Sequence, residues 1–404
     1  MKKIRFMVAF FICATLLFAA CTTAPPAPAA PAAAEAPAAQ EAPAAPEAAE
    51  PDNEADEIAE TAGPRELSIA IVTTSGVDDG SFGQAAYEGI LAYIALNPNA
   101  SVMAITEPDM GRVVDAAAQI MPGYDVVVLP GFQFAPIGDA AAMNPNTKIL
   151  LIDVVPRNAD GDEVELDNVY SMLFKEQESG FFAGVAAALE TRTGRVASAH
   201  GIAFPSNVNY QFGFASGVNF ANAHFGTSAE LIEIPAYAGT NVMGENVGGN
   251  YIGAFADRAT GRVVGEALIR EGVDIIFVAA GDSGNGVFAA VMEADGVFVI
   301  GCDVDQFDDG VVGDRNIVLT SALKNMGVNI TYQLNKIEAG TFAGGNVLLG
   351  ADTGSTGIVT APGRHQMSAD TLARLQEVEQ LLMDGTIVPA SNFTDFTPDN
   401  FPGL

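Results

Sequence analysis

The sequence predicts an α/β fold built from two parallel sheets. From Leu67 onward, short β-branched strands alternate with helical patterns, which is the rhythm of βαβ units. The part of the chain with this rhythm, residues 66–404, contains about 340 residues, which suits two α/β domains better than one. The candidate strands fall into two groups of five, and no short-period repeat is present. We therefore expect two doubly wound domains of similar size.

The first domain is organised around a strand-to-helix loop, residues 75–89. This loop follows the first strand and leads into a helix over residues 84–96, whose apolar positions recur three and four apart. In open α/β sheets, ligands bind at the carboxyl ends of the strands, where such loops gather. Asp79 and Ser81 are suitable helix N-caps. Phe82, at the helix entry, packs inward or stands in a pocket as a flat platform, and the loop alone leaves both possibilities open.

Other strands of this domain also end at residues that could serve a site. Asp153 directly follows a buried strand, where it either caps a loop or enters a pocket on the same edge as Phe82. Gly131 and Phe132 follow another strand. A helix over residues 176–189 comes next and carries small residues suited to close packing. The predicted strands are residues 68–72, 102–105, 126–129, 149–152 and 170–174.

The second domain begins near Gly194 and repeats the pattern. Phe204, Asp303 and Lys324 lie at its strand tips. A lysine is most often a solvated surface residue, but Lys is scarce in this chain and Lys324 lies beside the loop of Asp303, which favours a ligand role. Residues 235–250 form a Gly- and Asn-rich loop that we expect near the cleft. The predicted strands are residues 196–199, 231–234, 275–278, 297–300 and 317–320.

A glycine-rich segment, residues 281–286, reads GDSGNG. It does not match a nucleotide-binding loop, because the order is GxxGxG rather than GxGxxG and no GK[ST] follows. It does not fit a trypsin-like nucleophile either, since that fold is all-β. Two interpretations remain. The segment is either a tight loop that lets backbone N–H groups approach a ligand or a purely structural turn. A second glycine-rich stretch, residues 344–357, precedes a predicted helix over residues 368–383.

The acidic segment DVDQFDD, residues 303–309, is the feature most typical of an enzyme. It resembles the calcium-binding motif of nucleoside hydrolases, in which a metal activates water. In that family the motif follows the first strand, whereas here it lies late in the chain. It does not fit an EF-hand loop. With three His and no CxxC, neither a zinc site nor a His-based triad is supported, and we expect no metal and no cofactor.

The N-terminal segments have compositions of their own. Residues 1–20 combine a basic start with an apolar run too short for a comfortable membrane span, as in a signal peptide. Small residues before Cys21 resemble a lipoprotein cleavage site, so Cys21 is the expected lipid anchor, with an ordinary secretion signal as the alternative. Residues 21–65 are rich in Ala, Pro and Glu and predict a disordered tether.

The charge balance excludes one class of partner. The chain has 50 acidic and 18 basic residues and a formal net charge of −32. Nucleic acid is therefore not expected as a partner, because phosphate contacts depend on Lys and Arg. If Cys21 is acylated, Cys302 is left without a partner for an intramolecular disulfide. We also expect the protein to be a monomer.

Six segments in order resemble the basic membrane protein family of lipoproteins, which are solute-binding proteins of ABC importers. The segments are DGSFGQ (79–84), FKEQESGFFAG (174–184), YIGAFAD (251–257), AAGDSGNG (279–286), GCDVDQ (301–306) and TSALKN (320–325). They correspond to the family patterns DxSFNQ, FKExExxYLAG, VGSFxD, AAGxxGxG, GxDxDQ and TSxxKN. Gly83 replaces the Asn of the first pattern. Thr73 and Thr74 end the first strand, where nucleoside-binding relatives tend to have an acid.

The resemblance implies a type I periplasmic binding protein fold, with two doubly wound parallel-sheet lobes, three crossover strands and a ligand in the cleft. It implies that Phe82 stacks on a base, that Asp153 and Asp303 accept ribose hydroxyls, and that Lys324 is a cationic donor. Phe204 and Phe255 are candidates for a second stacking platform. The candidate ligand-binding residues are Thr74, Asp79, Phe82, Asp153, Phe204, Phe255, Gly281, Asp303 and Lys324.

These expectations together describe a membrane-tethered receptor that binds a small solute, most simply a nucleoside, delivers it to an ABC permease outside the cytoplasm and performs no chemistry. The alternatives are a calcium-dependent nucleoside hydrolase and a sensory receptor with the same cleft. The expected boundaries are a first lobe at residues 66–192, a second lobe at 193–322 and a C-terminal segment, 323–404, that crosses the hinge and completes both lobes.

Overall fold

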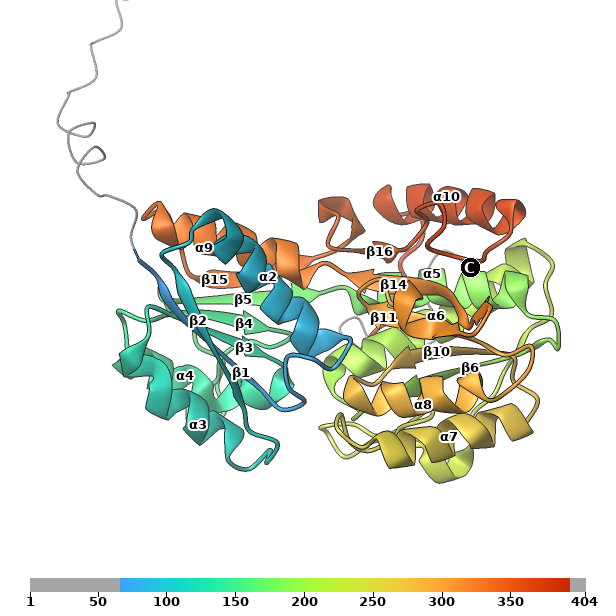
Figure 1. Cartoon of the computed structure of the whole chain (residues 1–404), viewed down its shortest axis with the longest axis horizontal. Coiled ribbons are helices and arrows are strands. Elements are labelled where there is room, and N and C mark those ends of the chain that lie inside the picture. Colours follow the sequence, from blue (N-terminus) through green and yellow to red (C-terminus); the bar gives the residue numbers. More distant parts are fainter. Residues whose placement is uncertain (1–65, 393–404) are drawn as a thin grey trace, which may run out of the picture. The chain divides into compact units, whose positions relative to one another are not determined.

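The computed structural model describes residues 66–392, which contain two six-stranded sheets covered by helices on both faces (Figure 1). The expected signal peptide, the lipid anchor at Cys21 and the tether lie outside the described residues. The described residues lie in one compact unit that contains all the apolar clusters described below, so this part of the chain has its own cores. Within the described range, no helix has both the length and the apolar character that a bilayer span requires.

The first sheet is entirely parallel, with the order β15-β5-β4-β3-β1-β2. Its inner strands are mostly apolar because both faces are covered. Helices α2 (Phe82–Leu96) and α9 (Met326–Glu338) cover one face, and α3 (Val113–Ile120) and α4 (Gly138–Met143) cover the other. The strands are β1 (Ser68–Thr73), β2 (Ser101–Thr106), β3 (Val126–Pro130), β4 (Lys148–Ile152), β5 (Val169–Phe174) and β15 (Gly345–Leu349). We call this sheet and its helices the first lobe.

The second sheet has the order β16-β14-β11-β10-β6-β7 and is parallel except for β16, which pairs antiparallel with β14. We call it and its helices the second lobe. The strands are β6 (Arg195–His200), β7 (Glu230–Leu231), β10 (Ile275–Ala279), β11 (Phe298–Asp303), β14 (Val318–Lys324) and β16 (Thr356–Ile358). One face carries α5 (Glu176–Glu190), α6 (Pro205–His224) and α10 (Ala369–Met383), and the other carries α7 (Arg258–Arg270) and α8 (Asp282–Met292).

Small additional elements lie in the connections. Two short antiparallel hairpins pair β8 (Gly239–Thr240) with β9 (Asn246–Gly248) and β12 (Val311–Val312) with β13 (Arg315–Asn316). The 3-10 turns are Met121–Gly123, Phe132–Ile137, Pro235–Tyr237, Phe307–Gly310 and Ala351–Thr353. All ten predicted strands overlap observed strands, although the one predicted at 231–234 is only the two-residue β7. Prediction missed β15 and β16, which lie in the glycine-rich stretch 344–357.

Helices α5 and α6 pack unusually closely through reciprocal glycines. A Cβ on Gly180 or Gly184 would lie 2.5 and 2.1 Å from the carbonyl oxygens of residues 210 and 214 in α6. A Cβ on Gly213 or Gly217 would lie 2.3 and 2.2 Å from carbonyl oxygens of α5. The backbones therefore touch where side chains would normally separate them. The small residues predicted for close packing in the 176–189 helix serve this contact.

The chain passes between the two lobes three times. It leaves β5 and enters α5 at Lys175, leaves β14 and enters α9 at Asn325, and returns from β15 to β16 through residues 350–355. Because α5 packs against the core of the second sheet, the first crossing lies at Lys175, upstream of the predicted boundary after residue 192. In the C-terminal segment, α9 and β15 pack in the first lobe, whereas β16 and α10 pack in the second.

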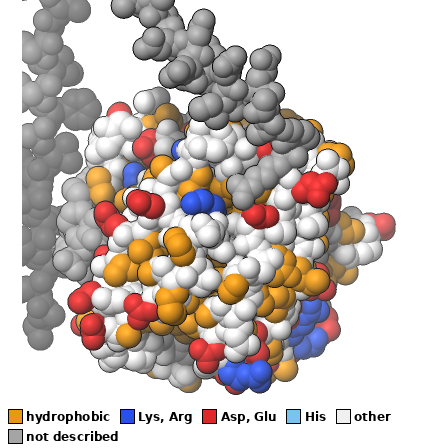
Figure 2. Space-filling model, turned by 90° about the vertical axis from the view of Figure 1, so that its left-hand side faces the viewer, with side chains coloured by type: hydrophobic (Ala, Val, Ile, Leu, Met, Phe, Trp, Pro, Cys, Tyr) orange, Lys and Arg blue, Asp and Glu red, His pale blue; other side chains and the backbone are white. Residues whose placement is uncertain are grey.

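The molecular surface agrees with the acidic composition. On the face shown in Figure 2, acidic side chains are scattered among apolar and neutral ones, and Lys and Arg occur in only a few places. The described residues visible on this face form no continuous basic area of the kind that binds phosphate backbones.

Candidate functional site

One cavity lies between the two lobes and has an empty volume of about 640 Å³, part of which is open to solvent. It is lined by the carboxyl ends of strands from both sheets and by the start of α6, which is the expected position for a ligand in open α/β sheets. The lining residues are Thr73, Thr74, Ser75, Phe82, Gly83, Pro130, Gly131, Phe132, Gln133, Asp153, Phe204, Ser206, Asn207, Tyr210, Phe255, Ala279, Gly281, Cys302, Asp303 and Lys324.

The structure brings eight of the nine predicted site residues to this one cavity. They come from strand tips and loops that are far apart in the sequence, which supports the reasoning from strand ends. The eight are Thr74, Phe82, Asp153, Phe204, Phe255, Gly281, Asp303 and Lys324.

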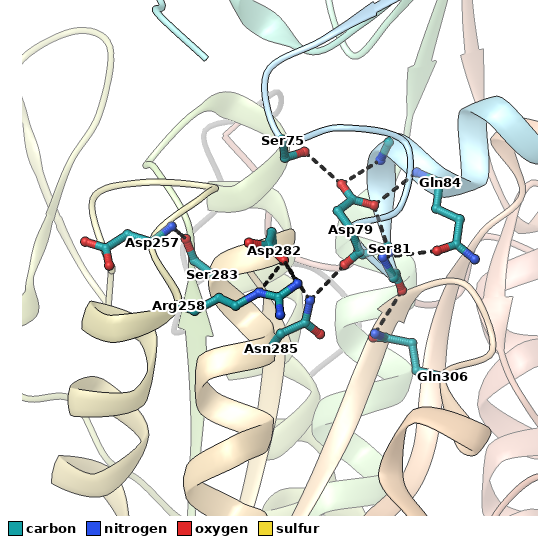
Figure 3. A network of polar contacts seen from close by, with 12 residues as sticks. Ser75, Asp79, Ser81, Gln84, Asp257, Arg258, Asp282, Ser283, Asn285 and Gln306 are labelled. Atoms are coloured by element: carbon teal, nitrogen blue, oxygen red, sulfur yellow. Dashed lines mark hydrogen bonds and ion pairs between the residues drawn. The ribbon is translucent and has the colours of Figure 1, made fainter. Parts of the chain in front are cut away.

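Asp79 is the exception, because it does not belong to the cavity lining. Its buried carboxylate accepts the backbone N–H groups of Ser81 (3.0 Å), Gly83 (2.9 Å) and Gln84 (3.0 Å) and the hydroxyl of Ser75 (2.8 Å) (Figure 3). These are the free donors at the start of α2. Asp79 therefore holds the loop against the start of α2. This is the helix-capping role that the sequence also indicated for it.

Aromatic side chains from both lobes face the cavity. Phe82 belongs to the first lobe, where it also packs against the apolar cluster under α2, so both alternatives for this residue hold at once. Phe132 of the first lobe meets Phe204 of the second, with ring centroids 5.3 Å apart. Phe204 in turn lies 5.9 Å from Phe255. Flat apolar surfaces therefore occur on both sides of the cleft.

Lys324 is the centre of a buried charged cluster. Its Nζ lies 2.5 Å from Oδ2 of Asp153 and 2.9 Å from Oε1 of Glu176, and all three side chains are almost completely buried. Burial by itself would lower the pKa of Lys324, but the charges of Asp153, Glu176 and Asp303 outweigh this effect and raise it above its ordinary value. The ammonium is also 5.1 Å from the ring centroid of Phe82. Lys324 therefore stays charged and is held by the first lobe and by α5.

Asp153 has an unused acceptor. Its Oδ2 binds Lys324, whereas its buried Oδ1 has no hydrogen-bond partner among the described residues. Burial raises the pKa of Asp153 to about 7, with Glu176 adding to the effect and Lys324 opposing it. Buried polar atoms are normally paired, so an unpaired carboxylate oxygen at a cavity wall indicates a place for a donor from a ligand.

Both carboxylate oxygens of Asp303 have hydrogen-bond partners within the protein. Its Oδ2 accepts the hydroxyl of Ser81 at 2.8 Å, and its Oδ1 accepts the hydroxyl of Tyr210 at 3.1 Å. Burial raises its pKa, and Lys324 and the two hydroxyls oppose the rise. The resemblance gave the two carboxylates the same role. In the structure, Asp153 has one oxygen without a partner, whereas both oxygens of Asp303 accept a hydrogen bond.

Two residues of this cluster escaped prediction. Tyr210 lines the cavity from the second turn of α6, and burial raises its pKa, so it remains a hydroxyl donor. Glu176 binds Lys324 and accepts Asn209 Nδ2 at 3.1 Å. The signal for Glu176 was its place in the FKE segment directly after a strand. Tyr210 lies inside a helix six residues beyond Phe204, and nothing in its local pattern distinguishes it from a core residue.

The glycine-rich segment at 281–286 divides into two parts. Gly281 lines the cavity with φ of +54°, a backbone conformation that favours glycine. Gly284 and Gly286 lie inside α8, and a Cβ on Gly286 would lie 2.0 Å from the carbonyl oxygen of Arg258 in α7. The prediction of a ligand-approaching loop therefore fits Gly281 alone, and the later glycines serve helix packing.

The acidic segment 303–309 does not converge on one point. Arg364 Nε binds Asp305 at 2.6 Å, and Arg364 Nη1 binds Asp308 at 2.8 Å. Asp309 accepts Gln306 Nε2 at 3.4 Å. Of the acids in this segment, Asp303 alone lines the cavity. Within residues 66–392, no group of three or more His, Cys, Asp or Glu side chains is arranged to hold a metal ion.

The loop at 235–250 was expected near the cleft, and this expectation is wrong. It contains the β8–β9 hairpin, and none of its residues lines the cavity. Its end is anchored to the second sheet, where Asn250 Nδ2 donates to the carbonyl oxygens of Ser198 (2.9 Å) and Ile232 (3.0 Å). The loop is therefore an outer addition to the second lobe.

A two-lobed α/β fold with a cavity between two mainly parallel sheets is typical of the class of type I solute-binding proteins. Residues 66–233 and 244–392 match the Bmp family, described as ABC transporter substrate-binding protein PnrA-like, and the chain belongs to this family. Of residues 234–243, which separate the two matched segments, all but the first belong to the outer loop described above. Membership implies a small-molecule ligand, a permease partner and a position outside the cytoplasm.

Curated relatives and solved structures agree with this family. The "CD4+ T-cell-stimulating antigen" of Listeria monocytogenes is 28% identical over 347 residues, covering 80% of this chain and 88% of the relative. The "ABC transporter nucleoside-binding protein BmpA" of Lactococcus lactis is 28% identical over 303 residues, covering 70% and 78%. A solute-binding protein structure from Aeropyrum pernix has a TM-score of 0.67 and 24% identity, covering 80% of this chain and 93% of that one, and shows the same fold. A second, from Conexibacter woesei, has a TM-score of 0.58 and 19% identity, covering 80% and 99%.

Proposed function

We propose that this protein is the receptor of an ABC importer that encloses a nucleoside between its lobes and delivers it to the permease without chemical change. The observation that carries the proposal is the pairing, in one cavity, of aromatic surfaces from both lobes with the unpaired Oδ1 of Asp153 beside Lys324. A nucleoside has a flat base and a sugar with vicinal hydroxyls, so it matches both parts. The name of the Lactococcus lactis relative, a nucleoside-binding protein, supports the same solute class.

The aromatic part would bind the base. Stacking of a base on an aromatic side chain contributes roughly 1–3 kcal/mol and tolerates differences among bases. Phe82 enters from the first lobe, and Phe204 and Phe255 enter from the second. A solute held between them contacts both lobes only when the lobes are together, so binding favours closure.

The charged part would bind the sugar. A hydroxyl that donates to Asp153 Oδ1 fills the acceptor that the protein leaves free. Lys324 is already paired with Asp153 and Glu176, so the cavity has no uncompensated cation for a phosphate or carboxylate. The site therefore favours uncharged solutes and disfavours nucleotides.

The hydrolase alternative has less support than the receptor. The acids that would form its metal site are dispersed, with Asp305 and Asp308 bound to Arg364. A sensory receptor would use the same cleft with a different partner. We further propose that Cys21 carries the lipid that anchors the protein to the membrane, which labelling with a radioactive fatty acid tests directly, with Cys21→Ala as the control.

A thermal-shift screen of residues 66–404 against nucleosides, free bases, ribose and nucleotides tests the proposed solute. A ligand at 100 times its dissociation constant stabilises the folded state by about 2.7 kcal/mol. We expect a shift with nucleosides and none with ribose, free bases or nucleotides. A shift with another solute class, and none with any nucleoside, would retain the receptor and overturn the nucleoside assignment. Calcium-dependent release of a free base would instead establish the hydrolase.

A further inference from the structure

The loop of residues 79–81 is fixed within the first lobe before it meets the second. The carboxylate of Asp79 accepts four donors from its own loop and from the start of α2, and Gly80 N–H donates to Gln84 Oε1 at 3.2 Å. Figure 3 shows these contacts on the inner side of the loop. The carbonyl groups of Asp79 and Gly80 and the hydroxyl of Ser81 are left for other partners, and their positions are set by the capped loop.

All three of these groups are bound by the second lobe. Asn285 Nδ2 donates to the Asp79 carbonyl oxygen at 3.0 Å, and Gln306 Nε2 donates to the Gly80 carbonyl oxygen at 3.0 Å. The Ser81 hydroxyl donates to Asp303 Oδ2 at 2.8 Å. These bonds follow one another along three consecutive residues, so a single rigid loop makes all of them together.

The partners in the second lobe are themselves held in place. Asn285 Nδ2 also donates to Asp282 Oδ1 at 3.0 Å, and Asp282 is bound by Arg258 Nε at 2.7 Å (Figure 3). Gln306 Oε1 accepts the N–H of Cys302 at 2.9 Å. Both sides of the contact are therefore preorganised, which reduces the entropy lost when they meet.

In the first lobe the contact lies away from the crossing segments. The chain leaves the first sheet at β5 and β15, whereas the loop follows β1, which is three places from β5 in the sheet order. In the second sheet, Asp303 ends β11 and Gln306 follows it, next to the crossing strand β14, and Asn285 follows β10, one place further away. Hydrogen bonds between the lobes must break when the lobes separate, while the crossing segments keep their contacts.

We propose that residues 79–81 form a latch that holds the two lobes together, and that Ser81 is the positioning residue that connects this latch to the cavity through Asp303. Asp303 accepts Ser81 of the opposite lobe with one carboxylate oxygen and Tyr210 with the other, and it also lines the cavity, so it connects the latch to the site. Asp153, with its free Oδ1, is the carboxylate that receives the solute. The inference requires that the lobes enclose a solute, as proposed above, and is independent of whether that solute is a nucleoside.

The test measures the separation of the lobes without any solute. Spin labels at Ala95→Cys in α2 and Glu271→Cys beyond α7 report the interlobe distance in residues 66–404, since both positions are exposed and Cys302 is buried. We compare the labelled parent with Ser81→Ala, Asn285→Ala and Asn285→Asp. Ser81 makes no side-chain cap to α2, so Ser81→Ala removes its contacts with the second lobe and leaves the helix start intact.

We expect each variant to shift the distance distribution toward longer separations. Asn285→Asp should shift it at least as far as Asn285→Ala, because it places a carboxylate against a carbonyl oxygen and against Asp282. Ser101→Ala and Asn346→Ala, which change exposed residues on β2 and β15, are the matched controls and should leave the distribution unchanged. Distributions of all three latch variants that coincide with those of the controls would overturn the latch.

A second measurement covers the role of Ser81. The dissociation rate of a bound solute, found by the thermal-shift screen, should rise about tenfold in Ser81→Ala, as expected for loss of a hydrogen bond to a charged group. An unchanged dissociation rate, together with a shift to longer interlobe distances, would support the latch but contradict the link from Ser81 to the cavity. If no nucleoside binds, the distance measurement still decides the latch, so the two proposals fail separately.

Discussion

Asp153 and Asp303 occupy equivalent positions in the two sheets. Asp153 directly follows β4 and Asp303 ends β11, and each strand lies next to the one from which the chain crosses to the other lobe. Among residues 66–392, these two are the non-glycine residues with positive φ, 66° and 68°. Such a backbone costs free energy and persists only where its surroundings impose it. The fold thus holds both carboxylates at the cavity in a strained conformation.

Asp153→Asn should weaken solute binding at least tenfold, because an amide cannot replace the unpaired carboxylate oxygen as an acceptor of charge-assisted hydrogen bonds, which contribute roughly 1.5–3 kcal/mol. Asn tolerates a positive φ, so the backbone should be preserved. Isothermal titration calorimetry measures the change. Asp160→Asn, an exposed residue of the first lobe, is the control. Equal affinities for both variants would show that Asp153 does not receive the solute.

Lys324→Met should destabilise the protein by about 3–5 kcal/mol, since it leaves the buried carboxylates of Asp153 and Glu176 without their cation. Urea unfolding followed by circular dichroism gives the free energy of unfolding. Lys336→Met, on the outer side of α9, should change it by no more than about 0.5 kcal/mol. A loss for Lys324→Met as small as that of the control would contradict the charged cluster.

The pKa of Asp153 predicts a pH dependence of stability. Its folded-state pKa, about 7, lies above the ordinary value of 3.8, so the folded state holds this proton more tightly than the unfolded state. The contribution of Asp153 to stability is therefore fully present below pH 3.8 and is lost as the pH rises toward 7. The difference in unfolding free energy between the parent and Asp153→Asn, measured from pH 4 to pH 8, should fall through this interval and then level off. A difference that rises with pH would reverse the assignment.

Gly184→Ala should destabilise the second lobe, because its Cβ would lie 2.1 Å from a carbonyl oxygen of α6 and the helices would have to separate. Overpacking of this kind costs roughly 1–3 kcal/mol or more. Differential scanning calorimetry measures the loss of thermal stability. Gly123→Ala is the matched control, since its Cβ meets nothing within 4 Å and its φ is not positive. Comparable melting temperatures for the two variants would contradict the close packing of α5 on α6.

Shortening the outer hairpin should leave solute affinity unchanged. Replacing residues 241–245 by Asn-Gly would join Thr240 to Asn246 through a two-residue turn suited to antiparallel strands. None of the removed residues lines the cavity. Titration calorimetry on the parent and the shortened chain makes the comparison, and a loss of affinity in the shortened chain would give the hairpin a place in binding.

Much of the fold could be predicted because its signals are local. Buried parallel strands are runs of β-branched residues, and the helices between them repeat every three or four positions. Strands β15 and β16 were missed because their glycines hide the strand pattern, and their partners are distant in the sequence. The expected boundary after residue 192 differs from the crossing at Lys175, because α5 is buried on nearly all sides and its sequence does not say which sheet it covers.

The site was predictable where a residue type and a strand end coincide. This rule found Asp153, Asp303 and Lys324. It could not separate a carboxylate that caps a helix from one that faces a cavity, so it included Asp79. The rule also could not distinguish the roles of Asp153 and Asp303. Their difference depends on which hydroxyl of the opposite lobe lies within hydrogen-bond distance. Ser81 is more than two hundred positions from Asp303 along the chain, so the sequence does not show this contact.

The position of β15 has a consequence for how the protein is made. This strand completes the edge of the first sheet beside β5, yet it is synthesised after nearly all of the second lobe. A ribosome that has finished residues 66–174 has therefore produced a five-stranded sheet with an open edge at β5. That edge lacks its partner strand until residues 345–349 emerge, and an unpaired edge strand can pair with another chain in the meantime.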